Sequence, residues 1–216
     1  DPRRRIELFH AGINDYVTKP PIEEEFAARI NNLISNKRLH DKVRDQKQAL
    51  SQLAMKDQLT TCHNRHSLVE NAPKYINDSI RYEHPLSIMI LDLDYFKTIN
   101  DEHGHDAGDR VLADIGKLLM KSFRLGDFVS RIGGEEFLII LSHCYAEDAV
   151  NKGNQIRSMI ESSKPGDMAL TASIGIASLS GEHGSDFDRL YKSADEAGYH
   201  SKSYGRKRVS VVSVIK

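Results

Sequence analysis

Residues 133–137 read Gly-Gly-Glu-Glu-Phe and lie between two short apolar runs, 128–132 (Phe-Val-Ser-Arg-Ile) and 137–141 (Phe-Leu-Ile-Ile-Leu). Glycine readily adopts the positive φ angles of tight turns, so we expect the two runs to pair as antiparallel strands of a hairpin. The turn then carries two adjacent carboxylates, Glu135 and Glu136. Paired acids repel each other unless a cation or a donor-rich ligand neutralises them, so the pentapeptide indicates a metal and phosphate site. The alternative is an ordinary solvated hairpin.

A second stretch, residues 86–109, starts as an apolar strand at 86–91 and runs into a polar loop. Asp92 would be held rigidly at the end of that strand, and Mg²⁺ prefers carboxylate ligands of this kind together with substrate phosphates. Lys97 is placed to neutralise charge on a phosphate. For Asp94, the alternative is a side chain that points into solvent. Mixed donors and acceptors suited to a base edge follow in the loop: Asn100, His105 and Asp109.

Together these motifs resemble the GGDEF family of diguanylate cyclases. The first reads Asp92-Leu-Asp-Tyr-Phe-Lys97-x-x-Asn100-Asp, continues to His105 and Asp109, and is followed by the 133–137 pentapeptide. Further matches lie before and after them in the family's order: Asp57-x-Leu59-Thr60, Asn64-Arg65, Ser173-Ile-Gly175, Ala194-Asp195 and Lys202-x-x-Gly205-Arg206. Because several motifs occur in the right order, over roughly residues 57–209, the resemblance is far more specific than one glycine-rich turn.

The resemblance implies condensation of two GTP molecules into cyclic di-GMP with release of pyrophosphate, using two Mg²⁺ (or Mn²⁺) ions per active site. It implies that Asp92 and Glu135 bind metal through their side chains and Leu93 through its backbone carbonyl. Glu136 would serve the second metal. Glu135 is also the position usually assigned to deprotonating the ribose 3′-hydroxyl, and metal activation without a discrete base is the alternative.

Three cations complete the implied catalytic set. Lys97 would stabilise charge in the transition state, while Lys202 and Arg206 would hold the terminal phosphates. Without the resemblance, each would be interpreted as a solvated surface charge.

Base choice follows from the chemistry of guanine. Guanine presents N1–H and N2–H₂ donors side by side, a pair that a carboxylate accepts and that adenine lacks. Asp109 and Asn100, at the family's base-reading positions, therefore favour GTP. The alternative for Asp109 is an acid at a helix start, because apolar residues follow at helical spacing: Val111, Leu112, Ile115, Leu118 and Leu119.

Arg124-Leu-Gly-Asp127 precedes the glycine pair at the distance typical of the family's inhibitory site for its own product. Arginine binds guanine O6 and N7 bidentately, a pairing that contributes about 1–3 kcal/mol of discrimination in nucleic-acid complexes. Product inhibition by cyclic di-GMP is therefore expected. The alternative is a surface ion pair contributing about 0–1 kcal/mol. Gln155 occupies the place of a second arginine, with Arg157 nearby, so inhibition is expected to be weaker or differently built.

The N-terminal part differs in kind. Residues 11–20 (Ala-Gly-Ile-Asn-Asp-Tyr-Val-Thr-Lys-Pro) and the amphipathic run after them resemble the last strand and helix of a response-regulator receiver domain. This implies that Lys19 contacts a phosphorylated aspartate, that the Lys19–Pro20 bond is often cis, and that an upstream histidine kinase acts on the receiver. We expect residues 1–35 to be a C-terminal receiver remnant. The alternative is a generic strand, turn and helix.

A heptad pattern connects this part to the rest, over residues 36–56. Apolar or polar seam positions recur at alternating four- and three-residue steps: Leu39, Val43, Gln46, Leu50 and Leu53. We expect a coiled-coil linker helix that pairs in a parallel homodimer, because the implied chemistry needs two nucleotide sites face to face. The alternative is one surface helix lying against its own domain.

Residues 57–216 are expected to form one α/β (α+β) domain, a mostly antiparallel, palm-like central sheet wrapped by helices as in nucleotidyl cyclases. Strands are predicted at 86–91, 128–132, 137–141, 168–178 and 208–215, and helices near 65–82, 106–122, 146–163 and 186–200. The helix at 65–82 is interrupted by Pro73. Two departures from the family pattern, Gly198 and Lys207, remove no proposed chemical group.

Composition limits the function further. The net charge of −1 gives no electrostatic footprint for nucleic acid, and no apolar run is long enough to span a bilayer. Cys62 and Cys144 lack metal or redox spacing, as expected for reduced thiols in the cytoplasm. The remaining alternatives to an active cyclase are a catalytically inactive cyclic di-GMP receptor and a signalling scaffold.

Overall fold

The computed structural model describes residues 19–20, 22–53, 55–179 and 187–212, without the side chains of 47–49 and 51–53. The chain divides into two compact units, Asp1–Leu53 and Ala54–Lys216. Residues 1–18 of the predicted receiver remnant and the end of the strand predicted at 208–215 lie outside the described residues. The receiver remnant therefore stays a prediction.

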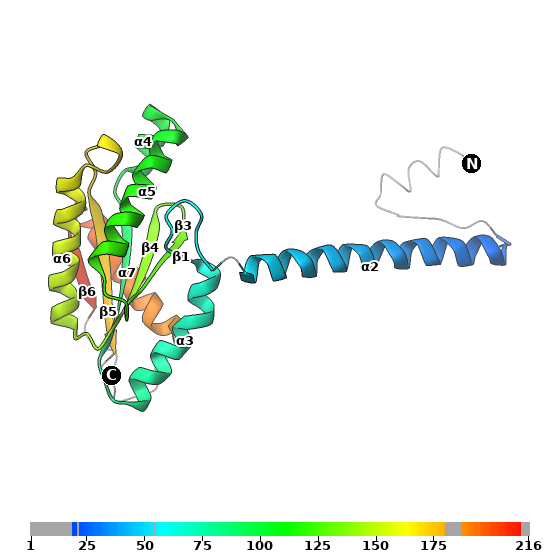
Figure 1. Cartoon of the computed structure of the whole chain (residues 1–216), viewed down its shortest axis with the longest axis horizontal. Helices are drawn as coiled ribbons and strands as arrows, with labels where there is room; N and C mark the ends of the chain where they lie inside the picture. Colours follow the sequence, from blue (N-terminus) through cyan, green and yellow to red (C-terminus); the bar gives the residue numbers. More distant parts are fainter. Residues whose placement is uncertain (1–18, 21, 54, 180–186, 213–216) are drawn as a thin grey trace. The chain divides into compact units, whose positions relative to one another are not determined.

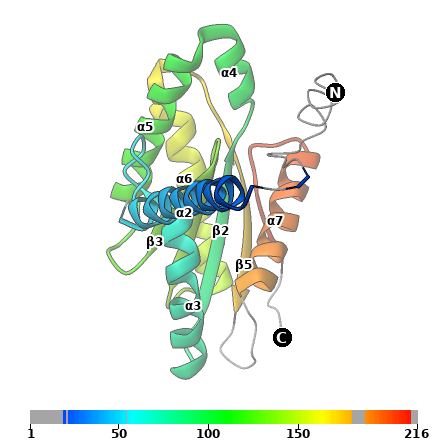
Figure 2. The same cartoon turned by 90° about the vertical axis from the view of Figure 1, so that its right-hand side faces the viewer.

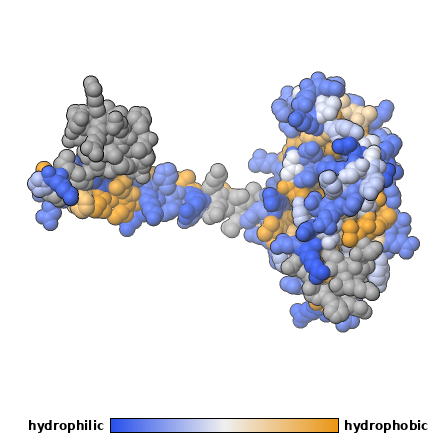
Figure 3. Space-filling view, turned by 180° about the vertical axis from the view of Figure 1, so that it is seen from behind, coloured by the Kyte–Doolittle hydropathy of each residue, from blue (hydrophilic) through white to orange (hydrophobic). Residues whose placement is uncertain are grey.

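The described part of the first unit is one long helix, α2 (Glu23–Leu53). It is preceded by a cis peptide bond between Lys19 and Pro20. Its large apolar side chains are exposed, and Figure 3 shows apolar surface along it. They include residues of the predicted heptad and of the run before it: Phe26, Ile30, Leu33, Ile34, Leu39, Val43 and Leu50.

The second unit is built on a mixed six-stranded sheet in the order β1-β3-β4-β2-β5-β6. The strands are β1 (His63–Asn64), β2 (Leu86–Leu93), β3 (Phe128–Gly133), β4 (Glu136–Ser142), β5 (Ala172–Leu179) and β6 (Val209–Val212). The four central strands pair antiparallel, while β1 and β6 add to the edges in parallel. The prediction of a mostly antiparallel sheet wrapped by helices is confirmed.

Helices cover both faces of this sheet (Figures 1 and 2). One face packs against α3 (Arg65–Arg81) and α7 (Phe187–Ser203), the other against α5 (His105–Ser122) and α6 (Ala146–Ser163). Each face of the sheet has its own hydrophobic core, and alternate side chains of β2 contribute to the two cores. Ile88 and Ile90 face α3 and α7, whereas Met89 and Leu91 face α5 and α6. Asp92 continues the first of these series, so its carboxylate lies on the α3 and α7 face.

The segment after β2 differs from the prediction. Residues 96–103 were expected to be part of a polar loop, but they form the short helix α4 (Phe96–His103). Only Phe96 and Ile99 are buried in it, so its apolar pattern is too short to show a helical period. Helix α3 runs through Pro73, whose side chain is exposed, so the lost backbone hydrogen bond lies on the solvent side. The strand predicted at 168–178 begins later, as β5 at Ala172, and a 3₁₀ turn, Pro165–Asp167, precedes it.

Candidate active site

The glycine-rich turn joins β3 to β4 as predicted. Gly133 pairs with Glu136 across the hairpin, and Gly134 has the left-handed φ of +46° that glycine adopts without strain. The turn is held from the side by Arg131, whose guanidinium donates two hydrogen bonds to the carbonyl of Gly134, at 3.0 and 2.8 Å. The conformation of the turn therefore depends on the Arg131 guanidinium as well as on glycine.

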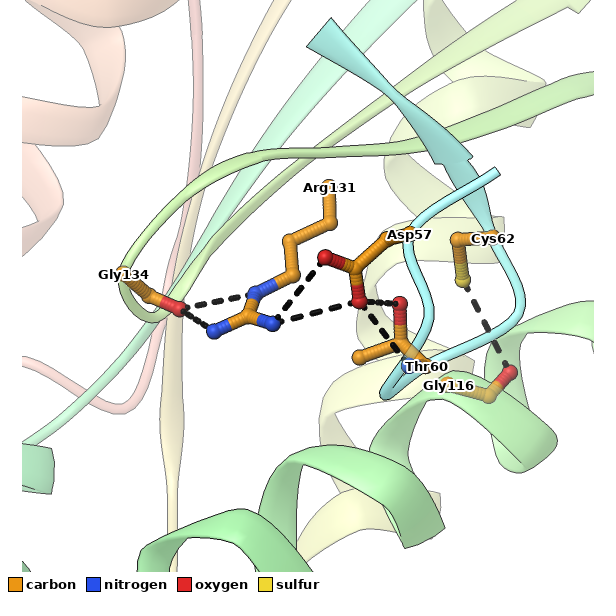
Figure 4. Close-up of polar contacts among 6 residues, drawn as sticks. All are labelled: Asp57, Thr60, Cys62, Gly116, Arg131 and Gly134. Carbon is orange, nitrogen blue, oxygen red and sulfur yellow. Dashed lines mark hydrogen bonds and ion pairs between the residues drawn. The ribbon is translucent and has the colours of Figure 1, made fainter. Parts of the chain in front are cut away.

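Arg131 also links the turn to the start of the domain (Figure 4). It donates to both carboxylate oxygens of Asp57, at 3.2 and 3.3 Å, and Asp57 accepts from the backbone and hydroxyl of Thr60, at 2.9 and 2.7 Å. Burial alone would raise the pKa of Asp57, but the Thr60 hydrogen bonds and the Arg131 charge hold that pKa below its ordinary value. The ionised carboxylate thus stabilises the link between Asp57 and Arg131, which we call the brace. The sequence motif contained Asp57 and Thr60, but nothing in it indicated Arg131 as their partner.

Two predicted acids meet at the sheet edge. Asp92, in β2, lies directly opposite Glu136, in β4, in the antiparallel register. Lys202, on α7, donates a 2.7 Å hydrogen bond to Asp92 Oδ2. Burial raises the pKa of Asp92, and the charges of Glu135 and Asp94 raise it further, while Lys202 opposes them. The structure therefore brings Asp92, Glu136 and Lys202 together, and their roles in binding metal and phosphate stay predictions.

Glu136 faces a cavity of about 580 Å³ between α3 and α7. Burial raises its pKa, followed by the negative charges of Asp92, Asp195 and Glu135, and only Lys202 among the causes opposes them. Glu135 is held through its backbone, because its carbonyl accepts from the amide of Leu93 at 3.4 Å. Negative charge at this edge is therefore only partly compensated by protein groups.

This donor set suits a hard divalent cation. Among the described residues, no three His, Cys, Asp or Glu side chains already converge on a point where a metal ion would fit. The carboxylate of Asp92 is nevertheless close enough to raise the pKa of Glu136, and carboxylate and carbonyl oxygens are the ligands that Mg²⁺ prefers. The chemistry of these residues therefore fits a divalent metal ion. Its binding would require small movements of neighbouring side chains toward the ion.

The alternative prediction for Asp94, that its side chain points into solvent, is wrong. Its side chain is fully buried and accepts hydrogen bonds from the hydroxyls of Thr171 and Ser173, both at 2.7 Å. It also accepts from the backbone amide of Lys207 at 3.2 Å. Burial of a carboxylate is costly unless such hydrogen bonds compensate it. Asp94 thus ties the end of β2 to β5 and to the turn after α7.

Arg206 lies on that same turn. Its guanidinium carbon is 4.6 Å from the centre of the Tyr95 ring, and its NH1 group donates to the Tyr95 hydroxyl at 3.3 Å. Its Nε lies 4.0 Å from Asp94 Oδ1. Arg206, which is predicted to bind phosphate, is therefore held by Tyr95 beside the end of β2, near the acids. The sequence analysis did not single out Tyr95.

The predicted base-reading and transition-state residues lie on α4 and α5. Lys97 and Asn100 project from α4, His105 is the first residue of α5, and Asp109 follows one turn later. Lys97, His105 and Asp109 are exposed, whereas Asn100 is half-buried. A Cβ on Gly108 would lie 2.0 Å from Asn100 Oδ1, so the glycine lets Asn100 pack against α5. This close approach places Asn100 beside the start of α5, where Asp109 lies.

Arg124 and Asp127 form an ion pair, as the alternative interpretation expects, and the inhibitory site stays a prediction. Arg124 donates from its backbone amide and from Nε to Asp127, both at 3.2 Å, and also hydrogen-bonds the carbonyl of Ser142. The pair borders a cavity of about 380 Å³ that Lys152 also lines. Gln155, in the place of the expected second arginine, accepts from Lys152 at 3.3 Å, and Arg157 pairs with Glu161 at 3.4 Å. Lys152 is thus a cation near this pair that the motif did not indicate.

The family model for the diguanylate cyclase GGDEF domain matches residues 54–208. The chain is 34% identical over 216 residues to the response regulator PleD of Caulobacter vibrioides, a match covering 97% of this chain and 47% of that protein. It thus spans about half the length of this curated relative.

Two solved structures share the fold. The active GGEEF domain of a diguanylate cyclase from Vibrio cholerae is 33% identical, with a TM-score of 0.65, and the match covers 69% of this chain and 96% of that one. The coiled coil and GGDEF domain of DgcB from Caulobacter crescentus, solved in complex with c-di-GMP, has a TM-score of 0.69 at 24% identity. That match covers 86% of this chain and 100% of the other, so the similarity of fold extends beyond the domain alone.

Proposed function

Because the chain belongs to the GGDEF family of diguanylate cyclases, we propose that it condenses two GTP molecules into cyclic di-GMP and releases pyrophosphate. The observation that carries the proposal is the pairing of Asp92 with Glu136 at the sheet edge, beside Glu135 in the turn and Lys202 on α7. An inactive receptor has no need for these acids, whose burial and mutual repulsion oppose ionisation.

In each half-reaction, the ribose 3′-oxygen of one GTP attacks the α-phosphorus of the other, and pyrophosphate leaves. Asp92, Glu135 and the carbonyl of Leu93 would hold one divalent cation, and Glu136 a second. Such a cation, when bound, neutralises phosphate charge and acidifies the attacking hydroxyl. Glu135, in the turn between β3 and β4, would accept the hydroxyl proton.

Cationic side chains bind the phosphates. Lys202 already lies 2.7 Å from Asp92, which fixes its ammonium group at the metal-binding edge. Arg206 reaches the same region from the turn after α7, and Lys97 projects from α4 to oppose charge that develops on the transferred phosphoryl group. Phosphoryl transfer is accelerated mainly by positioning and by such charge stabilisation.

Guanine is selected by Asn100 and Asp109. The amide and the carboxylate together accept and donate along the guanine edge, and His105 adds a further polar group at the start of α5. Adenine presents no adjacent N–H donors to the carboxylate, so ATP is a poor substrate.

The active form is a homodimer, since each domain contributes one GTP to the product. The exposed apolar side chains of α2 support pairing of this helix, because a solitary helix gains little from such a surface in water. A receiver domain upstream, phosphorylated by a histidine kinase, would alter how the two catalytic domains meet. The match to a response regulator along 97% of the chain supports that arrangement.

Product inhibition acts through Arg124 and Asp127. Their ion pair holds the guanidinium beside a cavity of about 380 Å³, where it can bind guanine of cyclic di-GMP. This pair also supports the second candidate function, a cyclic di-GMP receptor.

Substitution of Glu135 distinguishes the two functions. We expect Glu135→Ala to lower the rate of cyclic di-GMP formation by about 100-fold or more, as loss of a catalytic acid or base commonly does. Its circular dichroism spectrum and binding of cyclic di-GMP should match the parent chain. Glu147→Ala, at an exposed position on α6, is the control. Undiminished turnover in Glu135→Ala would contradict the site assignment, and binding without turnover in the parent chain would favour the receptor.

A further inference from the structure

We propose that Tyr95 is a positioning residue that holds the Arg206 guanidinium ready for the terminal phosphates of GTP. This inference rests on the proposed function, because it assigns Arg206 to those phosphates. The contact joins residues far apart in the sequence, Tyr95 at the N-terminus of α4 and Arg206 in the turn after α7.

The contact is made in two ways. The guanidinium carbon lies 4.6 Å from the ring centre, within the range of a cation–π interaction, and NH1 reaches the hydroxyl oxygen at 3.3 Å. Tyr95 is 64% exposed, so burial of its own ring does not explain its position. The ring instead lies against the guanidinium group of Arg206, at the edge of the site.

The backbone presents both side chains from unusual conformations. Tyr95 and Arg206 have left-handed φ angles of 58° and 60°, a region that residues other than glycine seldom adopt. Asp94 supports both, since it directly precedes Tyr95 and accepts from the amide of Lys207, directly after Arg206. A buried carboxylate thus fixes the two backbone segments from which the stacked pair projects.

The consequence for binding is preorganisation. A free arginine side chain loses much rotamer freedom when it binds phosphate, and that loss weakens affinity. Stacking on Tyr95 restricts Arg206 before the nucleotide arrives. Removal of the ring should therefore weaken binding of nucleotides that carry terminal phosphates and leave nucleoside monophosphates unaffected.

The test is calorimetric titration of the full chain with GTP and with GMP, in the presence of Mg²⁺. We expect Tyr95→Leu to weaken GTP binding about three- to ten-fold, and Tyr95→Phe, which keeps the ring, by about two-fold or less. GMP affinity should be the same in all three proteins. Tyr82→Leu is a matched control, because Tyr82 is 63% exposed and stacks with Arg81 at 5.4 Å, but on the C-terminus of α3.

Each outcome decides one question. If Tyr95→Leu binds GTP as tightly as the parent chain, or loses GMP affinity equally, the positioning role is wrong while the cyclase proposal stands. If the parent chain binds GTP with this dependence on Tyr95 but forms no cyclic di-GMP, the positioning role stands and the cyclase proposal fails. A parent chain that does not bind GTP overturns both.

Discussion

Glu136 lies directly across the sheet from Asp92, in the antiparallel register of β4 and β2. Two carboxylates on adjacent strands repel each other, and here both are also partly buried. Lys202 compensates one of them through its 2.7 Å contact with Asp92. This pairing concentrates uncompensated negative charge at the place where the proposed reaction needs cations.

The first prediction concerns stability against pH. Burial, then the neighbouring acids, raises the pKa of Glu136 above its ordinary value of 4.5 in the folded state. The ionised carboxylate therefore costs stability above that pH range, and the cost disappears as pH falls below 4.5, where Glu136 is protonated in both states. Glu136→Gln should raise the thermal midpoint at pH 7–8 and leave it nearly unchanged at about pH 4.

Thermal unfolding followed by circular dichroism between about pH 4 and 8 measures this effect. Glu147→Gln, at an exposed position of α6, controls for loss of a surface charge. An equal gain for Glu136→Gln at both ends of the pH range would show that the amide stabilises for another reason.

The second prediction concerns the brace between Asp57 and Arg131. Because the arginine also holds the Gly134 carbonyl, Arg131→Gln should destabilise the domain and lower turnover. A double-mutant cycle with Asp57→Asn should give a coupling free energy of about 1–3 kcal/mol, as expected for a charged hydrogen bond with partly buried partners. Chemical denaturation measures the coupling.

The exposed pair of Lys117 and Asp114, on α5, provides the comparison cycle, for which about 0–0.5 kcal/mol is expected. Equal coupling in the two cycles would mean that Asp57 and Arg131 contribute no more than a surface ion pair.

The third prediction concerns product inhibition. Arg124→Ala removes the guanidinium that binds guanine, so cyclic di-GMP should inhibit at least about five-fold more weakly, the loss expected for one good bidentate contact. The initial rate should be unchanged. Progress curves at increasing product concentration measure both, with Arg81→Ala as a distant control. Inhibition that persists undiminished in Arg124→Ala would show that the ion pair is structural only.

The fourth prediction concerns two facing glycines. A Cβ on Gly175, in β5, would lie 2.1 Å from the carbonyl oxygen of Ala194, so Gly175→Ala must push α7 from the sheet. A Cβ on Gly198, in α7, would come no closer than 3.8 Å to Gly175. We expect Gly175→Ala to cost about 1–3 kcal/mol of unfolding free energy and Gly198→Ala to add about 0.5–1 kcal/mol. Denaturant titrations of the two variants check this, and destabilisation by Gly198→Ala would contradict the geometry.

The long apolar strands were predictable because each has a regular pattern bounded by polar residues. The run at 86–91 became β2, and the hairpin around Gly134 formed as its glycines indicated. Helix α4 was missed because its apolar residues fill less than one helical period. The local pattern of apolar residues thus predicts long helices and strands. Short elements such as α4 depend on tertiary packing, which the pattern does not show.

The candidate site was predictable where one motif held neighbouring residues, as for Asp92 and the turn acids. The contacts that hold these residues in place were not predictable. Arg131 and Asp57 are 74 positions apart, and Tyr95 and Arg206 are 111 apart. Such contacts depend on how strands and turns are brought together, and no spacing in one sequence encodes them.

In the proposed reaction, two copies of this chain join two GTP molecules. The most direct measurement is mass-resolved detection of cyclic di-GMP after incubation with GTP and Mg²⁺ over a range of protein concentrations. We predict product formation with a specific rate that rises with protein concentration, because the active unit is a dimer. Absence of cyclic di-GMP at every concentration, from a chain that still binds GTP, would contradict the account.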